Sequence, residues 1–279
     1  MFYSIDKIFV LGLLKNRKAI EEKFNNLFVS NDDKKKLVYH YTEGVGNQTS
    51  NDGSYNANLK QILGHNTNDA ISKDIFINHI KIIEKAYLGK HQNIMVLEDD
   101  AVWDVKKALP IVTKMNNFIL TQPKSFDILY LGYCNYPFMF SAFSLKNPSI
   151  VRPFRPLCAH GYIVNRKGLA KILYYQKLVY PTFDGHIDKF YASCSHLRKK
   201  AVFPQFIFQD KPPALYTKAC DIIGVNVSFD TICKINENLS LVMCLLFYGL
   251  LFLVVFKLLR YATTGPKRLT NELIDSLKK

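Results

Sequence analysis

Short apolar runs alternate with stretches of helical periodicity along roughly the first 235 residues of this 279-residue chain. The runs at 8–14, 37–41, 93–97, 126–131 and 159–164 are suited to buried strands. The clearest helix is predicted between Asn68, which can cap its start, and Gly89, which can end it. Strands that alternate with helices predict an α/β domain with a central, mostly parallel sheet.

The pattern divides the chain into three parts: a folded domain over 1–235, a transmembrane helix over 236–259 and a short basic tail over 260–279. Leu239 to Phe256 is a run of eighteen residues without a charge. Such a run meets the length that a helix needs to span the hydrocarbon core of a bilayer. The alternative is a buried core helix, although core helices usually have a polar face.

The orientation of such a membrane anchor depends on two opposing signals. Residues 257–279 hold six Lys and Arg against two acids, which favours a cytosolic tail and a lumenal domain. The N-terminal stretch lacks the pattern of a signal peptide, because Asp6 and Lys7 interrupt it. We therefore expect a single-pass protein anchored C-terminally through Leu239–Leu259, with the folded domain facing the cytosol and the lumen as the alternative.

The amino-acid composition, and the net charge above all, indicates which classes of molecule the protein binds. The chain has 37 Lys and Arg against 23 Asp and Glu, a net charge of +14, which favours nucleic acid, an anionic membrane surface or phosphorylated ligands. Its six cysteines include no CxxC pair, which argues against a zinc site and a disulfide scaffold.

The sharpest chemical feature is an acidic triplet, Glu98-Asp99-Asp100, directly after the apolar strand at 93–97. In extended backbone Glu98 and Asp100 point one way and Asp99 the other. Carboxylates at the carboxyl end of a strand suit Mg²⁺ or Mn²⁺, which can also bind a diphosphate. The alternative is a helix cap or a solvated turn.

Further candidates each have an ordinary structural reading. His79 lies on an apolar helix face and can be a core residue, and Arg17 can hold a phosphate or be a solvated helix residue. Gly161, beside His160, permits the close approach of a backbone or a ligand. One of Asp184 and Asp188 can be a general base, or both can be surface charges. Gln209 can contact a ligand or simply end a strand.

In combination these segments resemble glycosyltransferase family 25, which includes bacterial lipooligosaccharide galactosyltransferases and collagen hydroxylysine galactosyltransferases. The matching segments, in order, are IDKIFVLGLLKNR (5–17), DIFINHIKIIEKA (74–86), NIMVLEDDAVW (93–103), FDILYLG (126–132), CAHGYIVNRKGLAKIL (158–173), YPTFD (180–184) and FPQFIFQD (203–210). The resemblance covers the chain from the first strand to about Asp210.

The resemblance implies a nucleotide-diphospho-sugar transferase fold of the GT-A type. It also implies an inverting hexosyltransferase that moves galactose or glucose from a UDP-sugar donor, with Mn²⁺ or Mg²⁺. The acceptor would be a hydroxyl of a glycan, a lipid-linked glycan or hydroxylysine, and no nucleic acid is expected.

By the same resemblance, the metal ligands are Glu98, Asp99 and Asp100, and the donor-binding residues are Arg17, His79, Glu98, Asp99, His160, Gly161 and Gln209. Asp184 matches the family's aspartate, but one extra residue separates it from Pro181, so Asp188 remains the alternative base. The aromatic and basic segment from Tyr133 to Arg155 is the expected acceptor platform, or a loop that covers the core.

Two rival functions remain open at this point. A metal-dependent phosphotransferase or nuclease would use similar carboxylates. A catalytically inactive, membrane-tethered module would bind a nucleotide-sugar or glycan without turning it over.

Overall fold

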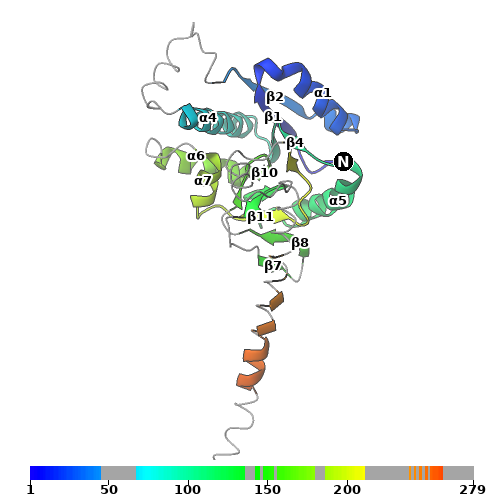
Figure 1. Cartoon of the computed structure of the whole chain (residues 1–279), viewed down its shortest axis with the longest axis vertical. Helices are drawn as coiled ribbons and strands as arrows, with labels where there is room; N and C mark the ends of the chain where they lie inside the picture. The colour runs from blue at the N-terminus through cyan, green and yellow to red at the C-terminus, as the bar shows by residue number, and fades with distance from the viewer. Residues whose placement is uncertain are drawn as a thin grey trace, which may run out of the picture.

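The computed structural model describes residues 1–44, 67–135, 142–144, 147–153, 156–179 and 186–210, with residues 239, 242, 245–246, 249–250 and 252–259 near the C-terminal end. In the described residues from 1 to 210, helices cover both faces of a central mixed sheet (Figure 1). The α/β class predicted from the sequence is confirmed.

The elements follow the apolar pattern closely. The strands of the main sheet are β1 (Lys7–Leu13), β2 (Leu37–Thr42), β3 (Asn93–Glu98), β5 (Ile128–Tyr130), β7 (Ala142–Ser144), β8 (Asn147–Arg152), β10 (Gly161–Asn165) and β11 (Lys199–Val202). Two short pairs lie outside it, β4 (Ala101–Val102) with β12 (Phe208–Gln209) and β6 (Cys134–Asn135) with β9 (Pro156–Leu157). The described helices through residue 210 are η1 (Leu14–Asn16), α1 (Arg17–Leu27), α2 (Asn31–Lys34), α4 (Thr67–Leu88), α5 (Val105–Thr121), α6 (Arg166–Val179) and α7 (Ile187–Ser193).

The helix limits agree with local sequence signals. Helix α4 ends immediately before Gly89, as predicted. Helix α5 begins after Asp104, whose side chain accepts hydrogen bonds from the backbone N–H groups of Lys106 and Lys107. Pro110 lies inside α5.

The strand order of the main sheet is β2-β1-β3-β10-β5-β11-β8-β7. Strands β1, β2 and β3 run parallel, and so do β5 and β11, but β10 lies antiparallel between β3 and β5. Strands β8 and β7 add two more antiparallel pairings at the far edge. Six of these eight strands point the same way, and β10 and β8 run against them, so the predicted mostly parallel sheet is in fact a mixed one. Apolar runs do not report strand direction, and β7 and β8 lie in a segment predicted to be a loop.

The first part of the sheet has a topological switch point. The chain passes from β1 to β2 on one side and then to β3 on the other side of β1. In open α/β sheets, ligands bind at such a point, outside the carboxyl ends of the strands. Here those ends are Leu13 of β1 and Glu98 of β3.

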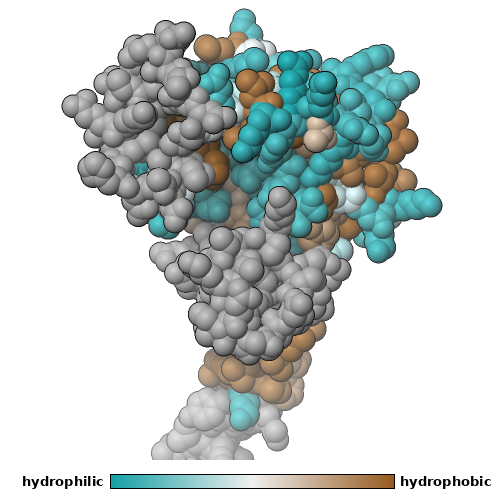
Figure 2. Space-filling view, turned by 45° about the horizontal axis from the view of Figure 1, so that its top comes forward, coloured by the Kyte–Doolittle hydropathy of each residue, from teal (hydrophilic) through white to brown (hydrophobic). Residues whose placement is uncertain are grey.

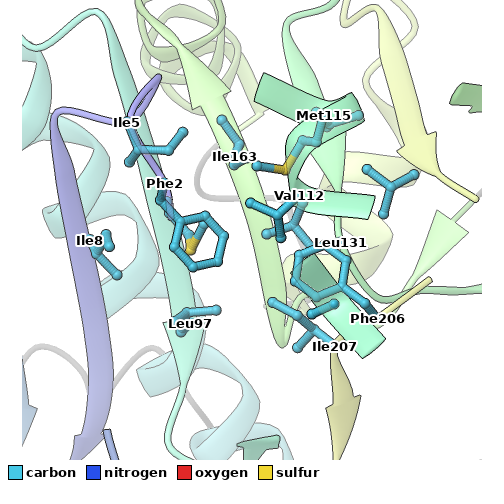
Figure 3. Close-up of a cluster of buried hydrophobic side chains, with 14 of the residues drawn as sticks. Phe2, Ile5, Ile8, Leu97, Val112, Met115, Leu131, Ile163, Phe206 and Ile207 are labelled. Atoms are coloured by element: carbon cyan, nitrogen blue, oxygen red, sulfur yellow. The ribbon is translucent and has the colours of Figure 1, made fainter. Parts of the chain in front are cut away.

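Two hydrophobic cores hold the helices against the sheet. Helices α1 and α5 cover one face, and α4, α6 and α7 cover the other. Figure 3 shows part of the first core, with Val112 and Met115 of α5 near Leu131, Ile163, Phe206 and Ile207, and with Phe2, Ile5, Ile8 and Leu97 alongside. Burial of this apolar surface is the main source of stability, at about 25 cal/mol per Å².

The C-terminal region contradicts one prediction. Its described residues are helical and include exposed apolar side chains, seen as brown below the largely hydrophilic described face in Figure 2. However, no helix among the residues that the structure describes is both long enough and apolar enough to cross a membrane. This finding contradicts the predicted membrane helix over 236–259 and the single-pass anchor through Leu239–Leu259.

Candidate functional site

The carboxyl edge of the sheet brings together residues that are far apart in the sequence. Because β10 runs antiparallel to β3, its first residue, Gly161, pairs with Leu97 near the end of β3. The backbone N–H of Glu98 donates to the carbonyl oxygen of His160 at 3.0 Å. The acidic triplet and the His160-Gly161 pair therefore lie side by side at the switch point.

Glu98 points to the face of the sheet covered by α4 and α7. Nε2 of His79, on α4, lies 3.2 Å from Oε1 of Glu98, and Nδ1 of His79 lies 2.8 Å from the hydroxyl oxygen of Tyr162. The Tyr162 hydroxyl in turn lies 2.9 Å from that of Tyr191 on α7. Because an ionised carboxylate only accepts hydrogen bonds, Nε2 is the donor in the His79–Glu98 bond.

These linked hydrogen bonds fix the position of the Glu98 side chain and keep its carboxylate ionised. The His79 side chain is 0% exposed, whereas that of Glu98 is 22% exposed. Burial alone would raise the pKa of Glu98, but the hydrogen bond and the electrostatic attraction of His79 outweigh it and hold that pKa below its usual value. His79 therefore acts on Glu98 and presents no surface of its own to a ligand.

Asp99 points to the opposite face, towards α1. Its carboxylate accepts a hydrogen bond from the backbone N–H of Leu13. Gly12 makes this approach possible, because a Cβ there would lie 3.1 Å from Cβ of Asp99 and 2.5 Å from Cδ1 of Ile20. Nζ of Lys23, on α1, donates to the backbone carbonyl oxygen of Asp99 at 2.8 Å. Burial and the nearby charge of Glu98 raise the pKa of Asp99.

Asp100 lies in the turn after β3, against the short strand β12. Nε2 of Gln209 donates to Oδ2 of Asp100 at 3.2 Å, and the backbone N–H of Asp210 donates to the carbonyl oxygen of Asp100 at 2.8 Å. Oδ1 of Asp100 and Oε1 of Gln209 are both buried without a hydrogen-bond partner. Burial and the charge of Glu98 raise the pKa of Asp100 to about 6.

The three carboxylates thus have three different sets of neighbours. Among the residues that the structure describes, no group of three or more His, Cys, Asp or Glu side chains is arranged to hold a metal ion. Mg²⁺ and Mn²⁺, however, are commonly bound through one or two carboxylates, with water and substrate phosphate as the other ligands. The unpartnered oxygen of Asp100 fits a cation of that kind.

His160 is a buried cationic group close to these acids. Its side chain is 2% exposed, and its Nε2 lies 3.3 Å from the carbonyl oxygen of Ile207. Burial opposes its charge, but interaction with Cys158 and attraction to Glu98 raise the pKa of His160 to about 9. A Cβ at Gly161 would lie 2.9 Å from Cγ2 of Ile207, so the Ile207 side chain fills the space beside this glycine.

Asp188 lies on the same side of the sheet as Glu98. It is in the first turn of α7, which packs against α4 through an edge-to-face contact of Phe190 with Phe76 at 5.1 Å. Burial, with Cys158 and Glu98 nearby, raises the pKa of Asp188 to about 7. The backbone N–H of Cys158 donates to this carboxylate, from a residue in the left-handed region with φ of 71°. Asp188 is partly exposed.

Other predicted site residues have different positions. The Arg17 side chain is 61% exposed and binds Glu21 at 2.9 Å, above the ring of Tyr41, so it does not point at the acidic triplet. Asp184 lies outside the residues that the structure describes. In the predicted acceptor segment Tyr133 is buried, with its backbone N–H donating to Oε1 of Gln205, and Arg152 is exposed. Tyr136, Phe138, Phe140 and Arg155 are also outside the described residues.

Sequence reasoning missed four residues of the site: Lys23, Cys158, Tyr162 and Tyr191. A signal existed for Lys23, which lies three residues after Ile20 and beside Phe24 on the apolar face of its helix. A cation at the margin of an apolar stripe indicates a specific partner. The two tyrosines follow strand and helix periodicity and gave no such signal.

Comparisons with known proteins add little to this geometry. No protein-family profile matches the sequence, and no curated protein matches it in a sequence search. Among solved structures, the chain is similar to a glycosyltransferase involved in the glycosylation of the major capsid of PBCV-1. The match has a TM-score of 0.34 and 11% identity over 71% of this chain and 82% of the other, and at that level it carries no argument.

Proposed function

We propose that this chain is an inverting glycosyltransferase that moves a hexose from a nucleotide-sugar donor to an acceptor hydroxyl. UDP-galactose and UDP-glucose are the favoured donors, and a glycan or hydroxylysine is the favoured acceptor, on the sequence resemblance. The observation that carries the proposal is Asp188, a partly exposed carboxyl whose pKa is raised to about 7 beside the acidic triplet. A general base works best when its pKa lies near the working pH.

Transfer with inversion needs a single displacement at the anomeric carbon. In the proposed mechanism, the ionised carboxylate of Asp188 takes the proton of the acceptor hydroxyl as its oxygen attacks. The sugar develops positive charge in the transition state, and Glu98, which His79 keeps ionised, supplies negative charge on the same side of the sheet.

The leaving diphosphate gains negative charge as the sugar departs. A divalent cation bound through Asp100 would neutralise that charge when present. Gln209 orients the Asp100 carboxylate through its 3.2 Å hydrogen bond. His160, whose pKa is raised to about 9, lies near these acids, and its attraction partly opposes the burial that raises the pKa values of Asp100 and Asp188.

The test is the release of free nucleoside diphosphate from a panel of UDP-sugars, with and without Mn²⁺, in the presence of candidate acceptors. Sugar-dependent release by the wild type, and its loss in Asp188→Asn, would support the proposal. NMR of the product would report the anomeric configuration. Donor binding without any release would indicate a binding module, and phosphate transfer without consumption of a nucleotide-sugar would indicate a phosphotransferase; either result contradicts the proposal.

A further inference from the structure

The two edges of the main sheet, β2 and β7, lie at opposite ends of the domain and differ in kind (Figure 1). Strand β7 has three residues, and its pairing with β8 shifts register between Phe143 and Ser144. Strand β2 has six residues in unbroken register with β1, and among the described residues no strand pairs with its outer side. A short, irregular edge resists the addition of another strand, whereas a long, regular edge favours it. The β2 edge is therefore the one suited to pairing.

The residues of β2 also lack the features that usually protect an edge strand. Its sequence, LVYHYT, has no proline and no Asp, Glu, Lys or Arg. Leu37, Tyr39 and Tyr41 pack against the core under α1 and α5, and Val38 packs against the core under α4, so both faces of the strand are partly apolar. Nothing in the strand itself opposes a second strand at its outer side.

The direction of the backbone groups follows from the pairing with β1. The backbone N–H of Ile8 donates to the carbonyl oxygen of Lys36 at 2.9 Å. Because the N–H and C=O groups of successive residues in a strand point to opposite sides, the even-numbered residues of β2 bond to β1. The odd-numbered residues, Leu37, Tyr39 and Tyr41, direct theirs to the outer side.

Charges of opposite sign flank the strand. Lys35 lies just before β2 and Glu43 just after it, and both side chains are exposed. The pair of Lys35 with Asp32, at 3.7 Å, is exposed as well, and such pairs contribute little. A second β2 that runs antiparallel, centred on Tyr39, brings Lys35 of each copy next to Glu43 of the other. A parallel copy would instead place like charges together.

We propose that β2 is a homodimer interface, at which it pairs antiparallel with β2 of a second copy of this chain. A two-fold axis beside Tyr39 relates the copies, so the same residues contribute on both sides and the main sheet continues from one copy into the other. The outward backbone groups of the odd-numbered residues form the hydrogen bonds between the copies. This inference goes beyond the proposed transferase function and does not depend on it.

The first test measures the dissociation constant of the full-chain dimer by sedimentation equilibrium. Glu43→Lys and Lys35→Glu each place like charges together at both ends of the interface, so each should weaken the dimer about tenfold. The double variant, Lys35→Glu with Glu43→Lys, restores opposite charges and should return the affinity to near the wild-type value. Glu22→Lys is the matched control, because Glu22 is an exposed acid of α1 and the change of charge is the same; it should leave the dimer unchanged.

A second measurement uses the wild type and so does not depend on the folding of a variant. NMR hydrogen exchange, followed as the protein concentration rises, reports the protection of each backbone amide. The outward amides of Tyr39 and Tyr41 should become several-fold more protected as the dimer forms. The amides of Val38 and His40, which bond to β1, should be protected at every concentration.

Three results would each overturn the inference. One is a wild type that stays monomeric at every concentration. Another is a dimer that neither single charge reversal weakens, or that the double variant does not restore. The third is protection of the Tyr39 and Tyr41 amides that is independent of concentration, which would mean that another part of the same chain covers the edge. None of these measurements uses sugar transfer, so failure of the dimer is distinguishable from failure of the transferase proposal.

Discussion

His79 and Glu98 meet across the contact between helix α4 and strand β3, with Nε2 of the imidazole 3.2 Å from Oε1 of the carboxylate. The imidazole is fully buried and the carboxylate is not, so one residue of the pair holds the other at the edge of the sheet. The Tyr162 hydroxyl, 2.8 Å from Nδ1, fixes the ring from its other side. The pair thus links the core of the protein to the candidate site.

Replacing His79 tests that link. His79→Ala should lower kcat about 10- to 100-fold, because Glu98 loses the group that orients it. It should also lower the free energy of unfolding by about 1–3 kcal/mol, since the buried Tyr162 hydroxyl loses a partner. Steady-state kinetics and urea unfolding measure the two effects. Tyr162→Phe leaves the His79–Glu98 bond in place, so an equal loss of kcat in that variant would contradict a positioning role for His79.

If Asp188 is the general base, kcat/KM should depend on pH in a specific way. Only the ionised carboxylate can accept a proton, and the pKa of Asp188 is raised to about 7, so kcat/KM should rise as pH increases through about 7 and then level off. Asp188→Asn should lower kcat by about 10²–10⁴-fold, remove that limb and leave donor binding intact. A variant that keeps wild-type turnover would exclude Asp188 as the base.

Asp100 should make the protein less stable at higher pH. Its pKa is about 6 in the folded state, above that of an unfolded aspartate, so the folded state binds more protons between about pH 4 and 6. Stability is therefore lost as pH rises through that window. Asp100→Asn keeps an oxygen for Gln209 and removes the charge, so it should raise Tm at pH 8 by about 2–4 °C and change it little near pH 4. Differential scanning calorimetry without divalent cations would show this, and a lower Tm at pH 8 would contradict it.

A buried ion-pair network around Asp127 should govern stability independently of the site. The Asp127 carboxylate is 0% exposed and binds Nζ of Lys171 at 2.6 Å and a guanidinium nitrogen of Arg198 at 2.7 Å. Asp127→Ala should lower the free energy of unfolding by about 1–3 kcal/mol, because the hydrogen bonds of the buried carboxylate are lost, while the partner side chains, 27% and 39% exposed, can still be solvated. Asp32→Ala is the matched control, since that side chain is 85% exposed and should change stability by less than about 0.5 kcal/mol.

The ion pairs of Asp127 should make the stability of the protein depend on pH in the opposite direction to Asp100. Burial opposes the charge of Asp127, but hydrogen bonds from Arg198 and Lys171 outweigh it and lower its pKa. Its contribution to stability is thus complete above the pKa of an unfolded aspartate, about 4, and is lost as pH falls below it. Acid unfolding of the wild type and of Asp127→Ala would measure the difference, and identical acid midpoints would rule this contribution out.

Much of the fold could be predicted because strand and helix periodicity are local properties. The run at 93–97 and the helix between Asn68 and Gly89 appear as β3 and α4 with ends within two residues of the prediction, although Asn68 lies inside α4 and does not cap it. Strand direction and order could not be predicted, because they depend on pairings such as that of Val96 with Tyr162, which are distant in the sequence. The strands β7 and β8 were missed because proline and aromatic residues made their segment look like a loop.

The site shows the same division. The acidic triplet could be recognised because three carboxylates directly follow an apolar strand. Which acid each neighbour contacts could not be predicted, since His79, Lys23 and Gln209 come from three different elements. The raised pKa of Asp188 depends on burial and on a neighbour, Cys158, that sequence spacing does not reveal.

The antiparallel insertion of β10 between β3 and β5 has a consequence for synthesis on the ribosome. Until residues 161–165 emerge, β3 has an open edge and β5 has no link to it, so the nascent chain carries two incomplete half-sheets. The main sheet can therefore close only after residues 161–165 have emerged, and until then the growing polypeptide exposes an unpaired strand edge.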